Sequence, residues 1–209
     1  MDAPAAKAKL VVGLIGGMGS GKSRVAAEFA RHGARVVAGD PLGHEGLRQP
    51  ELREQVVQRW GPGVLGADGE IDRRKLAAKV FADPVELRAL ERILFPWIER
   101  RLAEEIDRAQ HDPTVSLIVV DAAVMLEAGW DRNCDLLVYV HAPRDERWRR
   151  LAQQRGWNAK EVEEREQAQL PLTEKVRRAD VTVDNSGSAE SLARQVADLL
   201  GRWGLPTGT

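Results

Sequence analysis

Residues 16–23 read GGMGSGKS, and this short stretch restricts the possible folds of the chain more than any other feature. It matches the pattern G-x-x-x-x-G-K-[ST] at every fixed position. Glycines let a backbone turn tightly and approach a phosphate without a Cβ in the way, and successive N–H groups then surround an anion at the start of the next helix. Lys22 adds a charge for the β- and γ-phosphates, and the Ser23 hydroxyl can ligate Mg²⁺.

The residues on either side of this stretch support a nucleoside triphosphate site. Residues 10–15 form a compact apolar run typical of a strand buried on both faces, and residues 23–31 carry apolar side chains at helical spacing. A dinucleotide fingerprint would need G-x-G-x-x-G, and counted from Gly17 and Gly19 its third glycine position is Lys22. An accidental glycine loop would not require a strand before it and a helix after it. We therefore predict a phosphate-binding loop, or P-loop.

Apolar runs alternate with helix-like stretches along the rest of the chain. Further short strands are expected at residues 34–37, 117–120, 136–140 and 181–183, and helical patterns at about 45–110, 143–179 and 189–200. Strands joined by helical crossovers lie parallel in one sheet. The sequence therefore predicts an α/β fold with a P-loop NTPase-type parallel sheet flanked by helices.

Composition excludes several classes of partner. The net charge is −1, so the chain has no overall basic field for nucleic acid or a membrane surface. No apolar run approaches the roughly 20 residues of a membrane span. The single cysteine, Cys134, excludes an internal disulfide and a thiolate metal cluster, and a reducing cytoplasm is the expected setting. The oligomeric state stays open.

The later segments narrow the class of P-loop protein. A GTPase needs an N-K-x-D-type motif after a later strand, whereas the run at 136–140 leads into His141-Ala142-Pro143-Arg144. A charged, arginine-bearing segment precedes the last expected strand, which is typical of the closing lid of a small-molecule kinase.

Two aspartates follow expected strands, at the edge where ligands gather in open α/β sheets. Asp121 ends an apolar run of four residues, which is the Walker-B pattern of a Mg²⁺-associated acid, although a turn or helix cap is the alternative. Asp40 could orient an acceptor hydroxyl, take its proton and touch Mg²⁺. Asp40 before Pro41 is equally suited to cap a helix with proline in its first turn.

Four stretches together resemble the dephospho-coenzyme A kinase family. The P-loop opens with the paired glycines of that family, and residues 68–84 (DGEIDRRKLAAKVFADP) resemble its glycine–acidic–arginine–leucine–phenylalanine signature. Residues 119–130 (VVDAAVMLEAGW) resemble a segment with a Leu/Phe-Glu pair, and residues 179–187 (ADVTVDNSG) resemble its closing motif. The likeness covers nearly the whole chain from Leu10. It implies transfer of the γ-phosphoryl group of ATP to the 3′-hydroxyl of dephospho-CoA, the last step of coenzyme A synthesis.

The chain departs from the family pattern at three places. Ala38-Gly39-Asp40 keeps only the second acid of the usual Asp-x-Asp pair, and Phe95-Pro96 replaces a His-Pro. Residues 123–125 read Ala-Val-Met where the family has Pro-Leu-Leu. These departures concern the acceptor pocket more than the reaction.

The resemblance also implies how the chain is organised. We expect a single P-loop kinase domain over residues 10–205, with its core at 10–44, 111–143 and 179–205. A helical acceptor-binding insertion would occupy about 45–110 and a lid about 144–178. Residues 1–9 are expected to be a flexible tail.

The expected site residues fall into four groups. The catalytic group is Asp40, Lys22, Arg150 and Arg155. ATP would be bound by Gly17, Met18, Gly19, Ser20, Gly21, Lys22, Ser23, Arg24 and Asn185. Dephospho-CoA would be bound by Asp40, Arg73 and Glu127, and Mg²⁺ by Ser23 and Asp121.

Each assignment outside the P-loop has a plainer alternative. Acids nearly balance bases between residues 144 and 178, so Arg150 and Arg155 could simply belong to a solvated helix face. Arg73 could form a structural ion pair, Glu127 could partner an arginine, and Asn185 could belong to an ordinary Asn-Ser-Gly turn.

Two other functions fit a P-loop of this kind. A kinase for a nucleoside, nucleotide or sugar would keep the fold and change the acceptor, but it has no reason to carry the stretch at 68–84. A non-catalytic nucleotide-binding switch would bind ATP without turnover.

Overall fold

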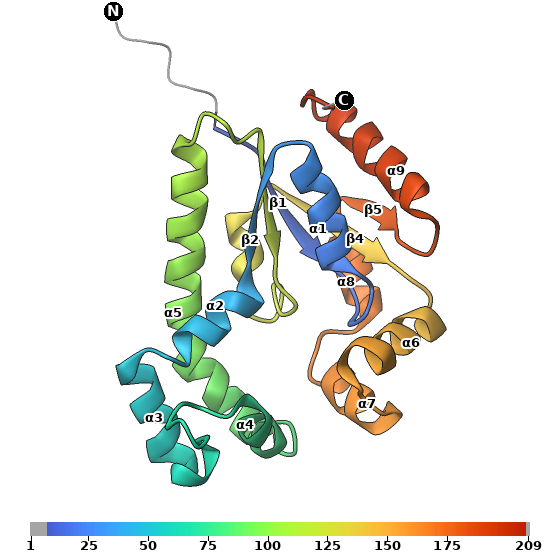
Figure 1. Ribbon diagram of the computed structural model, residues 1–209. Helices are drawn as coiled ribbons and strands as arrows, with labels where there is room; N and C mark the ends of the chain where they lie inside the picture. The colour runs from blue at the N-terminus through green and yellow to red at the C-terminus, as the bar shows by residue number, and fades with distance from the viewer. Residues whose placement is uncertain (1–7, 208–209) are drawn as a thin grey trace, which may run out of the picture.

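The computed structural model describes residues 8–207, and its centre is a single parallel β-sheet (Figure 1). The five strands run in the order β2-β3-β1-β4-β5, which confirms the predicted α/β class and the parallel sheet. They are β1 (Val11–Ile15), β2 (Ala34–Ala38), β3 (Leu117–Asp121), β4 (Leu136–His141) and β5 (Val181–Asp184). Residues 1–7 of the expected tail lie outside the described part, whereas the backbone N–H of Lys9 donates to Oε1 of Gln110 at 2.7 Å.

Helices occupy the segments between the strands and the end of the chain. The α-helices are α1 (Lys22–Arg31), α2 (Gly39–Gly46), α3 (Pro50–Trp60), α4 (Arg73–Val80), α5 (Pro84–His111), α6 (Arg144–Arg155), α7 (Ala159–Gln167), α8 (Leu172–Arg178) and α9 (Ala189–Arg202). Short 3₁₀ helices lie at Pro62–Val64 and Trp130–Asn133. Gly61, Pro84, Gly156 and Pro171 all lie between helices or at a helix start, because glycine and proline interrupt the helical hydrogen-bond pattern there.

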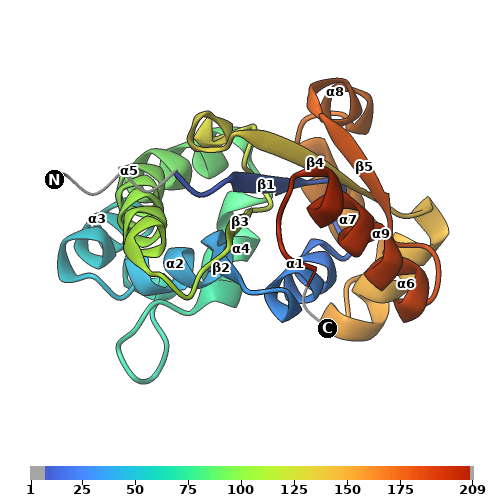
Figure 2. The same cartoon turned by 90° about the horizontal axis from the view of Figure 1, so that it is seen from above.

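Alternating side chains of each strand pack on opposite faces of the sheet. Val12, Leu14 and Val119 belong to a buried cluster with α1 and α9, while Val11 and Val120 belong to another with α5. Figure 2 shows α1 and α9 on one side of the sheet, with α5 and α8 on the other. Both faces are covered, so near-continuous apolar strands are stable here.

The carboxyl ends of β1, β2 and β3 lie next to one another at the same edge of the sheet. Asp121 at the end of β3 pairs with Leu14 of β1 and with Ala38 of β2. Since β3 lies between β1 and β2, the connections from β1 and from β2 leave this edge on opposite sides. Ligands bind in such a crevice of an open parallel sheet.

The remaining helices lie beyond that edge. In Figure 1 α3 and α4 lie below the sheet on one side, and α6 and α7 lie below it on the other. Within residues 8–207, no helix is both long enough and apolar enough to cross a membrane.

Candidate active site

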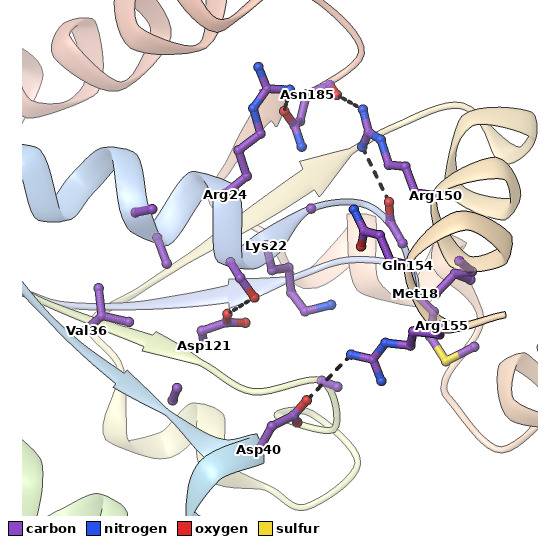
Figure 3. Close-up of a pocket in the computed structure, with 18 of the residues that line it drawn as sticks. Met18, Lys22, Arg24, Val36, Asp40, Asp121, Arg150, Gln154, Arg155 and Asn185 are labelled. Atoms are coloured by element: carbon purple, nitrogen blue, oxygen red, sulfur yellow. Dashed lines mark hydrogen bonds and ion pairs between the residues drawn. The ribbon is translucent and has the colours of Figure 1, made fainter. Parts of the chain in front are cut away.

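A pocket of about 800 Å³ lies at the carboxyl edge of the sheet (Figure 3). It is bounded by the P-loop and α1, by β2 and the start of α2, by the end of β3, by α6 with Trp157 two residues beyond it, and by Asn185 after β5. The expected site residues that line it are Met18, Gly19, Gly21, Lys22, Ser23, Arg24, Asp40, Asp121, Arg150, Arg155 and Asn185. Gly17, Ser20, Arg73 and Glu127 are not among its lining residues. The fold thus brings most of the expected residues to one place.

Two P-loop glycines are required by the backbone and by their neighbours. Gly19 and Gly21 have φ angles of 72° and 87°, in the left-handed region that favours glycine. A Cβ on Gly19 would collide with the carbonyl oxygen of Arg147, and one on Gly21 with Nδ2 of Asn185. The sequence explained these glycines by close approach of a phosphate, and the structure adds that α6 and the residue after β5 pack directly against them.

Lys22 is the first residue of α1, and its side chain extends into the pocket (Figure 3). Lys22 is 9% exposed, and within the described part of the chain Nζ donates a single hydrogen bond, to the carbonyl oxygen of Gly16 at 3.4 Å. Burial lowers the pKa of Lys22, and the nearby Asp121 carboxylate opposes that shift. No carboxylate of residues 8–207 lies within ion-pair distance of Nζ, so the ammonium retains donors for a bound anion.

Ser23 and Asp121 form a paired oxygen site beside Lys22. The Ser23 hydroxyl donates to Oδ2 of Asp121 at 2.7 Å, from the first turn of α1 to the end of β3. A hydroxyl and a carboxylate are hard oxygen donors, which suit Mg²⁺ when substrate phosphates and water complete its shell. No group of three or more histidine, cysteine or acidic side chains within the described residues could hold a metal alone. The donor set therefore fits a cation that arrives with a nucleotide.

Asp40 lies in the first turn of α2 and does not cap it. The N-cap residue is Ala38, and no side chain caps this helix, so the alternative of Asp40 as an N-cap is wrong. The helix starts at Gly39, two residues earlier than an aspartate cap would place it, because β2 runs straight into it. The Asp40 side chain is 64% exposed, and its Oδ2 lies 4.0 Å from Nη2 of Arg155. An acceptor hydroxyl can reach this carboxylate.

The lid arginines divide into two kinds. Arg150 donates to the carbonyl oxygens of Ser20 and Asn185 at 3.2 and 2.7 Å and pairs with Glu146 at 2.6 Å. Arg155 faces Asp40 across the pocket. Arg150 therefore fastens α6 to the P-loop, and Arg155 is the one directed at the open space.

Sequence reasoning did not single out Arg147, which is 4% exposed. Its guanidinium donates to the carbonyl oxygen of Met18 at 3.1 Å and to Glu166 at 2.5 Å, so one side chain joins the P-loop, α6 and α7. Nothing in the sequence separates it from its neighbouring arginines, because its burial depends on where the P-loop lies in space.

Asn185 is buried and holds the P-loop. Its Nδ2 donates to the carbonyl oxygen of Ser20 at 2.8 Å, and its Oδ1 accepts from Arg24 at 3.1 Å. Asn185 therefore does more than form a turn, since it positions both the loop and an arginine at the pocket wall.

Arg73 and Glu127 lie away from the pocket lining. The Arg73 guanidinium contacts Nε2 of His44 on α2. Oε1 of Glu127 accepts from Nζ of Lys175 at 2.9 Å and from the backbone N–H of Leu170 at 2.8 Å. Lys175 is only 2% exposed, so Glu127 is the counter-charge of a buried ammonium. The partner of Glu127 is thus a lysine, whereas the structural alternative for this residue was an arginine.

The chain is similar to known proteins over most of its length. A family model described as dephospho-CoA kinase matches residues 10–191. A curated dephospho-CoA kinase of Anaeromyxobacter dehalogenans is 40% identical over 199 residues, which cover 91% of this chain and 92% of the relative. One from Aquifex aeolicus is 39% identical over 187 residues, covering 88% and 93%.

Solved structures share the architecture. A crystal structure from Thermus thermophilus superposes with a TM-score of 0.78 at 35% identity, over 94% of this chain and 98% of the other. A dephospho-CoA kinase from Campylobacter jejuni gives a TM-score of 0.66 at 18% identity, over 92% and 96%, which is a likeness of fold.

Proposed function

The chain belongs to the dephospho-CoA kinase family and is an ATP-dependent kinase of dephospho-CoA, and from this premise we propose which residues carry the transfer. The γ-phosphoryl group moves to the ribose 3′-hydroxyl in the pocket at the carboxyl edge of the sheet. The observation that carries this proposal is that Lys22, Asp40, Asp121 and Arg155, from four separate segments, line one pocket.

The nucleotide phosphates bind in the P-loop. Backbone N–H groups of residues 17–24 surround them at the positive end of α1, and Lys22 neutralises charge on the β- and γ-phosphates. Its unused donors support this role. Arg24 and Asn185 form the nucleotide side of the pocket, where their hydrogen bond keeps both side chains in place.

Asp40 acts as the general base. The acceptor oxygen forms a bond to the γ-phosphorus while the bond to the bridging oxygen breaks, and that electron pair leaves with ADP. The hydroxyl proton passes to the Asp40 carboxylate. Lys22 and Arg155 offset the charge on the transferring group, as fixed cations do in a water-poor site.

Ser23 and Asp121 would hold Mg²⁺. When bound there, the cation would offset negative charge on the phosphate groups and so reduce their repulsion toward the incoming hydroxyl. The 2.7 Å hydrogen bond between the two side chains supports the assignment, because it holds both oxygens at the pocket wall.

The acceptor side is assigned to the helical segment at about 45–110, and the lid to about 144–178. Arg73 is the candidate for an acceptor phosphate, since a guanidinium can bind phosphate oxygens in pairs. Glu127 lies outside the pocket lining, so it affects the acceptor side indirectly, through its buried ion pair with Lys175. We also propose a cytosolic site of action, which the use of a single cysteine supports.

Incubation with Mg-ATP and a panel of hydroxyl acceptors tests the proposal. ADP release is followed together with product mass, and dephospho-CoA should gain one phosphate at the 3′-hydroxyl. Asp40→Asn should lower kcat by at least about a hundredfold with little change in nucleotide affinity. Phosphorylation of only a nucleoside or sugar, or full activity of Asp40→Asn, would refute the assignments.

A further inference from the structure

A row of stacked side chains runs from the pocket across the lid to the helical segment on the acceptor side. The Arg155 guanidinium carbon lies 5.0 Å from the ring centroid of Trp157, and that of Arg165 lies 4.3 Å from the same ring. The Arg165 carbon also lies 4.5 Å from the ring centroid of Phe81. At its inner end, Arg155 pairs with Asp40 at 4.0 Å.

This row joins parts of the chain that are far apart in sequence. Phe81 directly follows α4, whereas Arg165 lies on α7, and both helices lie below the sheet in Figure 1. Phe81 is anchored, because it is partly buried against the core cluster that includes α5. Arg165 therefore connects the expected lid segment to a residue that is packed against the core.

The charge of Arg165 is not used in an ion pair. No carboxylate of residues 8–207 lies within 4.0 Å of it, and its one hydrogen bond is to the carbonyl oxygen of Glu161 at 3.0 Å. A guanidinium without a carboxylate partner that lies over two rings is held by cation–π attraction. A purely solvated arginine would not be placed between them.

We propose that Phe81, Arg165 and Trp157 form a latch that holds Arg155 of the lid at the transferring phosphoryl group. Phe81 and Arg165 lie outside the pocket lining and are positioning residues, whereas Trp157 lines the pocket beside Arg155. The inference rests on the proposed role of Arg155. Latching also keeps the lid over the pocket, which excludes water as a competing acceptor.

The test compares two variants, Phe81→Leu and Arg165→Met, with the wild-type chain. Phe81→Leu keeps an apolar side chain and removes the ring. Each should lower kcat for dephospho-CoA by roughly threefold to tenfold, the range given by a cation–π contact, and leave the KM for ATP unchanged. Arg165→Lys should recover part of the loss. ATP hydrolysis without acceptor should rise relative to transfer. Arg144→Met is the matched control, because Arg144 lies over Trp148 at 4.1 Å within the lid, and its kinetics should stay at the wild-type level.

The decisive measurement repeats Phe81→Leu in an Arg155→Ala background. A latch that acts through Arg155 predicts no further loss of kcat there, whereas an equal loss in both backgrounds would overturn it. If Arg155→Ala lowers kcat and neither latch variant does, only the latch is wrong. If Arg155→Ala leaves kcat unchanged, the role proposed for Arg155 fails and the latch fails with it.

Discussion

Replacing Lys22 with methionine should make the free enzyme more stable and nearly inactive. Methionine keeps an unbranched side chain, one atom shorter than that of lysine, and removes its charge. Lys22 is 9% exposed, and among residues 8–207 its ammonium uses one long hydrogen bond of 3.4 Å and has no close counter-charge, so it is desolvated. A buried polar group left without partners costs about 1–3 kcal/mol. In a chain of this length that corresponds to a rise in Tm of about 2 to 12 °C.

In the presence of ATP, the wild-type chain should be more stable than the Lys22→Met variant. At a free nucleotide concentration about 1,000 times Kd, binding stabilises the wild-type chain by about 4.1 kcal/mol. The variant loses the ammonium that neutralises the phosphates, so it gains much less. Thermal unfolding with and without Mg-ATP gives both values, and turnover should fall by at least about a hundredfold.

The pH dependence follows from the direction of the pKa shift. Burial lowers the pKa of Lys22 below its usual 10.5, so the charged form destabilises the folded state relative to the unfolded one. The advantage of the variant is complete below the lowered pKa and disappears as the pH rises toward 10.5. A variant that is less stable than wild type without nucleotide, or equally stabilised by ATP, would refute this reasoning.

Three further perturbations test particular contacts. Gly19→Ala should lower stability by more than Gly69→Ala, because both residues have φ angles above 70° but only the Cβ on Gly19 meets backbone; equal denaturant midpoints would contradict this. Glu127→Gln should cost about 3–5 kcal/mol by leaving the Lys175 ammonium buried and unpaired, and adding Lys175→Met should restore most of the loss in urea unfolding. If the double variant is as stable as wild type but its KM for dephospho-CoA is higher than that of wild type, Glu127 acts on the substrate as well. Burial raises the pKa of the Cys134 thiol to about 12, so thiol reagents at pH 8 should modify it only after unfolding; rapid labelling of the folded chain would show that the site opens.

The sequence determined the fold and the centre of the site because both depend on local patterns. Apolar runs and glycine–proline breaks define the strands and helices, and their alternation requires a parallel sheet. Once the strands are parallel, residues 16–23, Asp40 and Asp121 must meet at one edge. The Ser23–Asp121 contact also requires β3 to lie next to β1, which the strand order of the folded sheet provides.

Only the tertiary structure decided which charged residues of the lid do what. Arg147, Arg150 and Arg155 look alike in sequence, yet one is buried against the P-loop, one is bonded to its carbonyl groups and one faces Asp40. The pairing of Glu127 with Lys175 could not be predicted from the sequence either. A local pattern specifies which face a helix buries, but a charge takes its role from the partner that folding brings beside it, and that partner lies at no fixed distance in the sequence.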